Sequence, residues 1–294
     1  YMNKNNNFKD SLYDYSRIAE DDNDDLALQF CTEVLGLESL HWGYWDTDEI
    51  NLENLKKAQK NFTIHLASFI PEGVNQILDV GCGIGDNAVY LADKDYQLTC
   101  ISPDVNHEIA FNKIENGKIN FHLDTIENFR SDVSFDLALM SESSNYFDKD
   151  EGFQKLHNLI KDEGFVLSAS LFRIDNSNEY NNFHIESEWL KSAENHGFKV
   201  VNKDDITDNV VHLCTLGKNI LDQYAFPTSK VLFKYLNKTK GLKSKIFSYF
   251  LQPQFDKLIA YLDDGYVSHM CNADLFKQKA RYIIYLLKKE HGNS

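Results

Sequence analysis

The pattern of hydrophobic and polar residues separates predicted strands from predicted helices along the chain. Short apolar runs such as NQILDV (75–80) and FVLSASLF (165–172) have the length of buried strands. In NLENLKKAQKNFTIHLASFI (51–70), by contrast, apolar residues recur at the spacing of an amphipathic helix, and Pro71 follows it. The pattern predicts seven strands, at 75–80, 96–102, 119–124, 135–143, 165–172, 198–206 and 280–289.

Helical patterns lie between most of these strands, at 85–95, 103–114, 149–164 and 186–197. Alternating helices and continuously apolar strands predict an α/β, Rossmann-like fold, with a mostly parallel seven-stranded sheet covered by helices on both faces. We expect an N-terminal helical segment over 1–50, a core over 51–206 and 280–290, and a helical insertion over 207–279 that folds over the sheet before the last strand.

Composition and charge narrow the classes of protein. The 294 residues are 43% hydrophobic, which suits a globular core, and the net charge of -15 disfavours nucleic acid as a partner. The five scattered cysteines form no C-x-x-C pair, so neither a zinc ribbon nor a disulfide framework is expected. No apolar run is long enough to cross a bilayer, and the polar start YMNKNNNFKD is unlike a signal peptide. We expect a cytoplasmic protein without stable membrane insertion; a homodimer is left open.

The most informative stretch is ILDVGCGIGDNAVYLA (77–92), in which a predicted strand meets three alternate glycines and then a helix. Ligands of parallel sheets bind at the carboxyl ends of the strands, and glycines let the backbone approach them closely. A dinucleotide fingerprint needs a third glycine where this chain has Asp86, whose carboxylate would repel a pyrophosphate. The carboxylate of Asp86 suits a ligand that carries an ammonium or a sulfonium. The alternatives are a simple glycine turn capped by Asp86 and a nicotinamide oxidoreductase, which Asp86 disfavours.

This stretch resembles motif I of the class I S-adenosylmethionine-dependent methyltransferases. Segments NFHLDTIENF (120–129) and 134–173, from the predicted fourth strand to the fifth, continue the resemblance. HWGYWD (41–46), the SPD of 102–104 and DDITDNV (204–210) are similar to the small-molecule branch that contains the glycine and sarcosine, tocopherol and cyclopropane-forming enzymes. The resemblance implies S-adenosylmethionine as cofactor.

The resemblance also implies where the cofactor binds. Asp124 would bond the adenine amino group, with Thr125 or Ile126 packed beside it. Cys100 stands where most relatives have an acidic residue for the ribose, with Ser102 and Asp104 just beyond. The aromatic residues of 41–46 would cover the methionine end; the alternative is an aromatic staple between the first helices and the core. The expected cofactor-binding residues are Trp42, Tyr44, Asp79, Gly81, Gly83, Gly85, Asp86, Cys100, Ser102, Asp124, Thr125, Ile126 and Ser141, and no metal is expected.

The acceptor side is predicted at the end of the fourth strand. Glu142, Ser143 and Tyr146 follow it, and Glu142 is the first candidate for acceptor binding or for a general base. The alternative for Glu142 is a cap of the next helix. His41 is the alternative base because its ordinary pKa is near neutrality. The candidate catalytic residues are Glu142, His41 and Tyr146.

The insertion over 207–279 would act as a lid over the acceptor. Its aromatic residues are expected to pack rather than to form a substrate box, and its lysines to form a solvated basic face rather than a membrane surface. These residues are Tyr224, Phe226, Phe233, Tyr235, Phe247, Tyr249 and Phe250, and Lys230, Lys234, Lys238, Lys240, Lys243 and Lys245. EDDNDD (20–25) is expected to be a solvated turn, and HIESE (184–188) a surface loop rather than a metal site.

Together these features predict a methyltransferase that moves a methyl group by in-line displacement to an oxygen or nitrogen of a small molecule in specialised metabolism. One alternative is carbon methylation of a prenyl or aromatic acceptor, since an aromatic pocket could shield a carbocation. A second alternative is a cofactor-binding protein without catalysis.

Overall fold

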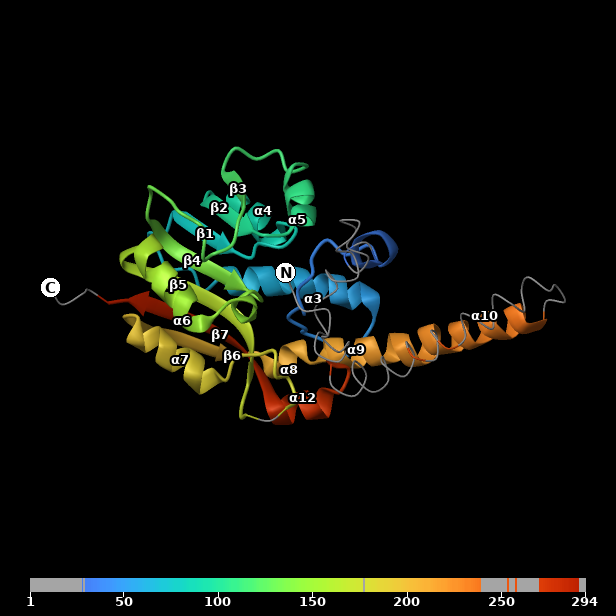
Figure 1. The fold of residues 1–294 in the computed structure, drawn as a ribbon. Helices are drawn as coiled ribbons and strands as arrows, with labels where there is room; N and C mark the ends of the chain where they lie inside the picture. Colours follow the sequence, from blue (N-terminus) through green and yellow to red (C-terminus); the bar gives the residue numbers. More distant parts are fainter. Residues whose placement is uncertain are drawn as a thin grey trace.

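A computed structural model describes residues 28, 30–176, 178–238, 253, 257 and 270–290 and has a single seven-stranded sheet at its centre (Figure 1). The order across the sheet is β3-β2-β1-β4-β5-β7-β6. The first five strands are parallel, and β7 runs antiparallel to both β5 and β6. The strands are β1 (Gln76–Val80), β2 (Gln97–Ser102), β3 (Ile119–Leu123), β4 (Phe135–Ser141), β5 (Ile160–Arg173), β6 (Phe198–Asp205) and β7 (Ala280–Lys289). The predicted fold class and all seven strands are confirmed.

Both faces of the central strands are buried, as their continuously apolar sequences predict, whereas the edge strands β3 and β6 are largely exposed. In β1, Ile77 belongs to the hydrophobic cluster on one face, whereas Leu78 and Val80 belong to the cluster on the other. Successive side chains of a strand point to opposite faces, so an apolar residue at every position requires cover on both sides. That cover comes from α3 (Leu52–Ala67), α4 (Asp86–Asp93), α5 (Val105–Phe111), α6 (Lys149–Leu159) and α7 (Glu186–Asn195).

The helices begin where capping side chains satisfy their first amides. Asn51, Asp104 and Asp148 accept hydrogen bonds from backbone N–H groups at the starts of α3, α5 and α6. The predicted end of α6 is wrong: the helix stops at Leu159 rather than at residue 164. The chain turns tightly at Glu163, whose φ is 63°, and the pairing of β4 with β5 shifts register there.

The N-terminal segment is less helical than predicted. Residues 1–27, including EDDNDD, lie outside the described residues; Phe30–Val34 form one turn of π-helix, and residues 35–50 form neither helix nor strand. Hydrogen bonds from distant side chains replace helical ones, since Gln59 Nε2 donates to the carbonyl oxygens of Ser39 and His41.

The insertion contains α8 (Thr207–Val210), α9 (His212–Ile220), the π-helical turn η4 (Leu221–Ala225), α10 (Phe226–Lys238) and α12 (Ala273–Lys279). Figure 1 shows α10 extending away from the sheet. Tyr224 and Tyr235 are each 65% exposed, so the expected packing of the aromatic residues is wrong for these two. The predictions for Phe247, Tyr249, Phe250, Lys240, Lys243 and Lys245 fall outside the described residues. None of the helices in the described ranges is long and apolar enough to cross a membrane.

Candidate active site

A cavity of about 1280 Å³ opens at the carboxyl ends of β1, β2 and β4. Val80, Ser102 and Ser141 line it from the strand ends, and the turn from β1 to α4 lines it between them. Pockets for one small ligand are about 300–1,000 Å³. The cavity is therefore large enough to hold two ligands side by side.

The glycine turn after β1 leaves this cavity open. Gly81, Gly83 and Gly85 have φ values of 74°, 56° and 92°, a region that residues with a Cβ rarely adopt. A Cβ on Gly81 would lie 2.5 Å from the Cβ of Ser143, whereas a Cβ on Gly83 would meet nothing within 4 Å. Gly81 is thus required by close packing, and Gly83 keeps ligand space free.

Asp79 lies under this turn as a buried carboxylate without a partner. Its side chain is 1% exposed, and neither oxygen has a hydrogen-bond partner among the described residues. Burial, followed by the negative charge of Asp86, raises the pKa of Asp79 to about 7. A buried carboxylate with no donor is costly unless a cation approaches it, so this site suits a positively charged ligand.

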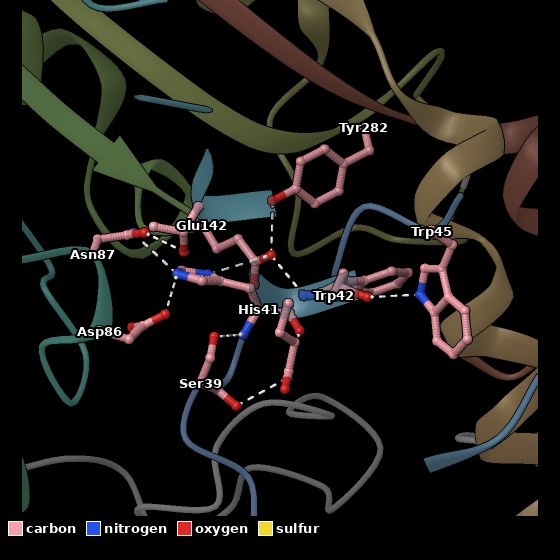
Figure 2. A network of polar contacts seen from close by, with 10 residues as sticks. Ser39, His41, Trp42, Trp45, Asp86, Asn87, Glu142 and Tyr282 are labelled. Carbon is pink, nitrogen blue, oxygen red and sulfur yellow. Dashed lines mark hydrogen bonds and ion pairs between the residues drawn. The ribbon is translucent and has the colours of Figure 1, made fainter. Parts of the chain in front are cut away.

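His41 is the centre of a polar network on the opposite side of the turn (Figure 2). Its Nε2 lies 3.3 Å from Asp86 Oδ2 and 3.0 Å from Asn87 Nδ2, and its Nδ1 lies 3.8 Å from Glu142 Oε1. Burial opposes a charged imidazole, but the carboxylates, Asp86 first, raise the pKa of His41 to about 9. Burial likewise opposes ionisation of Asp86, and the positive charge of His41 lowers the pKa of that carboxyl. This raised pKa favours the doubly protonated, cationic form of His41 at neutral pH.

Glu142 is held in place from two directions. Its Oε1 accepts hydrogen bonds from the backbone N–H of Trp42 at 3.0 Å and from the hydroxyl of Tyr282 at 2.7 Å. Its φ is 60°, and burial raises the pKa of Glu142 despite the nearby charge of His41. Glu142 is not the cap of the next helix, since Asp148 caps α6. The sequence analysis missed Tyr282 and Asn87, because no motif marks a single polar side chain on an apolar strand or helix.

The structure brings most of the predicted site residues to the cavity. Those that line it are His41, Trp42, Gly81, Gly83, Asp86, Ser102, Asp124, Thr125, Ile126, Ser141, Glu142 and Tyr146. Tyr146 is 70% exposed, so it lines the cavity from a solvent-exposed position.

Four predicted cofactor-binding residues do not line the cavity. Tyr44 stacks on His65 with ring centroids 4.4 Å apart, which is the aromatic staple considered as the alternative. Cys100 is fully buried beside Asp79 in the register of β1 and β2, so Ser102 is the residue that β2 presents to the cavity. Gly85 faces Phe111 and Ile114. Asp79 itself lies beneath the turn.

The segment HIESE is only partly a loop, since Glu186 begins α7, and two of its side chains are hydrogen-bonded within the fold. His184 Nε2 bonds the carbonyl oxygen of Ser144, and Glu186 accepts from the hydroxyl of Tyr285. Among the residues that the structure describes, no group of three His, Cys, Asp or Glu side chains is placed to hold a metal ion.

Comparison with known proteins agrees with this geometry. A methyltransferase-domain family matches residues 77–164, from β1 into β5. An O-methyltransferase from Pyrenophora dematioidea is 33% identical over 113 residues, which cover 35% of this chain and 42% of that protein. The chain thus spans less than half the length of the curated relative that it matches.

Solved structures share the fold at low identity. A protein from Galdieria sulphuraria assigned as a sarcosine dimethylglycine methyltransferase has a TM-score of 0.68 at 17% identity, covering 92% of this chain and 98% of that one. A geranyl diphosphate C-methyltransferase from Streptomyces coelicolor A3(2), solved with Mg²⁺, geranyl diphosphate and S-adenosyl-L-homocysteine, has a TM-score of 0.59 at 12% identity, covering 93% and 97%. The chain therefore has the Rossmann-like fold of the class I methyltransferases. Residues 77–164 match a methyltransferase domain, and the fold of the described chain is that of these solved methyltransferases.

Proposed function

We propose that this chain is an S-adenosylmethionine-dependent methyltransferase that methylates an oxygen or nitrogen of a small molecule. The observation that carries the proposal is the buried, unpaired carboxylate of Asp79 beneath a glycine turn that opens into the cavity. A ligand with positive charge close to the turn would offset the buried charge of that carboxylate, whereas a pyrophosphate would add negative charge. The match of residues 77–164 to a methyltransferase domain supports the same ligand.

The lining residues fit such a cofactor along its length. Gly81 and Gly83 would admit its methionine end close to the backbone, and Ser102 would reach its ribose from the end of β2. Asp124 would accept a hydrogen bond from the adenine amino group, with Ile126 packed beside the ring. When bound, S-adenosylmethionine supplies an electrophilic methyl group on a sulfonium.

Glu142 is the proposed general base, and His41 is its charged partner. Because its pKa is about 9, His41 is protonated at neutral pH and cannot accept a further proton. Burial raises the pKa of Glu142, which makes its carboxylate a stronger proton acceptor. With the cofactor bound, the acceptor oxygen would take its methyl group, and the hydroxyl proton would pass to the carboxylate of Glu142. Alignment contributes about 7–11 kcal/mol and the base about 10²–10⁴-fold.

Carbon methylation is the second candidate function. Trp42, Tyr146 and Phe147 line the cavity, and aromatic faces there could stabilise a cationic intermediate on a prenyl or aromatic acceptor. The name of the curated relative favours oxygen, and the structural neighbour from Streptomyces coelicolor favours carbon. Three predictions stand beside this proposal: a small-molecule partner, no nucleic-acid partner and a cytoplasmic location. The sequence leaves a homodimer open.

The experiment that tests the proposal is transfer of an isotope-labelled methyl group to a panel of alcohols, amines, phenols and prenyl compounds. We expect labelled product with the label on oxygen or nitrogen, located by mass spectrometry and NMR. Label on carbon would favour the second candidate. Tight binding of S-adenosylhomocysteine without turnover on any acceptor would favour a non-catalytic binding protein.

A further inference from the structure

One side of the cavity is a continuous apolar surface, which we call the apolar wall. It is built from the segment before α3, from α3 and from α9, whose side chains form one hydrophobic cluster. The apolar wall consists of Cys31, Leu37, Leu55, Leu213, Leu216 and Ile220. It shares no residue with the set that fits the cofactor, so we assign it to the second ligand of the cavity.

The charges around the cavity are mainly negative. The described residues that line it include five carboxylates and two imidazoles, and none of them is Lys or Arg. Both imidazoles lie beside carboxylates: His41 beside Asp86 and Glu142, and His107 with its Nε2 3.8 Å from Asp104 Oδ2. A phosphate or carboxylate placed here would lose its hydration and meet carboxylates, and the described lining residues offer no Lys or Arg to pair with it. An uncharged group has no such penalty.

From this combination we propose that the acceptor is a largely apolar alcohol or amine without an anionic group, and that acceptors bearing a phosphate, diphosphate or carboxylate are rejected. The apolar wall holds the carbon skeleton and excludes water, while Glu142 meets the polar end of the acceptor. Burial of apolar surface against the wall stabilises this arrangement. The role of the bound molecule as methyl acceptor rests on the proposed function; its charge preference does not.

The test uses three probes with one carbon chain and different head groups: decanol, decanoate and decyl phosphate. Dissociation constants are measured by ligand-observed NMR, with and without S-adenosylhomocysteine. We expect decanol to bind, and we expect both anionic probes to have dissociation constants at least about tenfold larger than that of decanol. Equal or tighter binding of either anionic probe, or no binding of decanol, would overturn the inference. Failure of S-adenosylhomocysteine to bind would contradict the proposed function instead, and the probe comparison without it would still decide the charge preference.

A matched pair of variants locates the preference in the cavity. Ile220→Lys puts an ammonium on the apolar wall, whereas Ile64→Lys adds the same charge on α3 at a side chain that is 52% exposed and does not line the cavity. We expect Ile220→Lys to raise decanoate binding relative to decanol about tenfold and Ile64→Lys to leave the ratio unchanged. If Ile220→Lys does not fold, Leu213→Lys is measured in its place. An unchanged ratio in the folded cavity variant would overturn the inference.

Discussion

The imidazole of His41 lies between two carboxylates, with Nε2 3.3 Å from Asp86 Oδ2 and Nδ1 3.8 Å from Glu142 Oε1 (Figure 2). The two carboxylates come from different elements, since Asp86 is the first residue of α4 and Glu142 follows the end of β4. His41 thus joins the glycine turn to the proposed base. The positive charge that it carries at neutral pH assigns it to positioning rather than to proton abstraction.

This arrangement predicts a pH dependence of stability. The pKa of His41 is raised from 6.5 to about 9 in the folded protein, so its stabilisation is complete below about pH 6.5 and is lost as pH rises through about 9. We expect His41→Gln to flatten the free energy of unfolding over that range, removing about 1–3 kcal/mol of pH dependence. Urea unfolding at several pH values measures this. Equal slopes in wild type and variant would contradict the charged state of His41.

The glycine turn predicts a specific loss of cofactor affinity. Gly83→Ala places a Cβ in open cavity space at a φ of 56°. Gly73→Ala is the matched control, since Gly73 has a φ of 86°, also has nothing within 4 Å of its Cβ position and does not line the cavity. Both variants should lose about 1 kcal/mol of stability from backbone strain, but only Gly83→Ala should weaken S-adenosylhomocysteine binding, by about tenfold or more. Calorimetric titration measures the affinity, and equal affinities of the two variants would count against the turn as ligand site.

Asp79 predicts that cofactor affinity increases with pH. Its pKa is raised to about 7, so below that pH the free protein holds it mainly protonated, and a cationic ligand must displace the proton. We expect S-adenosylhomocysteine, through its ammonium, to bind several-fold more tightly at about pH 8 than at about pH 6, with proton release that calorimetry in buffers of different ionisation enthalpy detects. Asp79→Asn should bind weakly at both pH values. A flat profile in the wild type would exclude an ammonium at Asp79.

Glu142 predicts a separation of turnover from binding. We expect Glu142→Gln to lower kcat by about 10²–10⁴-fold, because the amide cannot accept the acceptor's proton, while S-adenosylhomocysteine affinity changes little. Steady-state kinetics on the acceptor found in the methyl-transfer assay tests this. Wild-type turnover would remove Glu142 from the mechanism.

Two tyrosines of β7 provide a graded control for the same idea. Tyr282 donates to Glu142 on one face of the sheet, and Tyr285 donates to Glu186 on the other. Tyr282→Phe should slow turnover about tenfold by removing one hydrogen bond that positions Glu142, and Tyr285→Phe should leave turnover unchanged. In Tyr282→Phe the pH profile of kcat should also shift, which a purely structural defect would not produce.

Local patterns explain what was predictable from the sequence. The seven strands follow from apolar runs, and the glycine turn follows from three glycines and two acids within eight residues, Asp79 to Asp86. Interactions across the fold were not predictable. Tyr282 and Glu142 are 140 residues apart, and their hydrogen bond depends on β7 inserting antiparallel next to β5. The predicted N-terminal helical segment over 1–50 includes residues 35–50, but tertiary hydrogen bonds hold these residues in an irregular path.

The predicted ribose contact also shows that a local motif was predictable from the sequence but the packing of its side chains was not. The motif points to Cys100, but the structure buries that side chain within the sheet and presents Ser102 to the cavity. Tyr44 lies in the motif 41–46 with Trp42, yet only Trp42 lines the cavity, since Tyr44 packs on His65. Which neighbour in a motif faces a ligand depends on packing, and a single sequence does not contain that information.

The claim that this cavity binds a cationic cofactor is tested most directly by calorimetric titration of the protein with S-adenosylhomocysteine and, separately, with NADH. Asp79 and Asp86 next to the glycine turn favour a ligand with positive charge and oppose a pyrophosphate. We expect S-adenosylhomocysteine to bind with one-to-one stoichiometry and NADH to give no saturable heat. Saturable binding of NADH, with none of S-adenosylhomocysteine, would contradict the assignment of this cavity to a cationic cofactor.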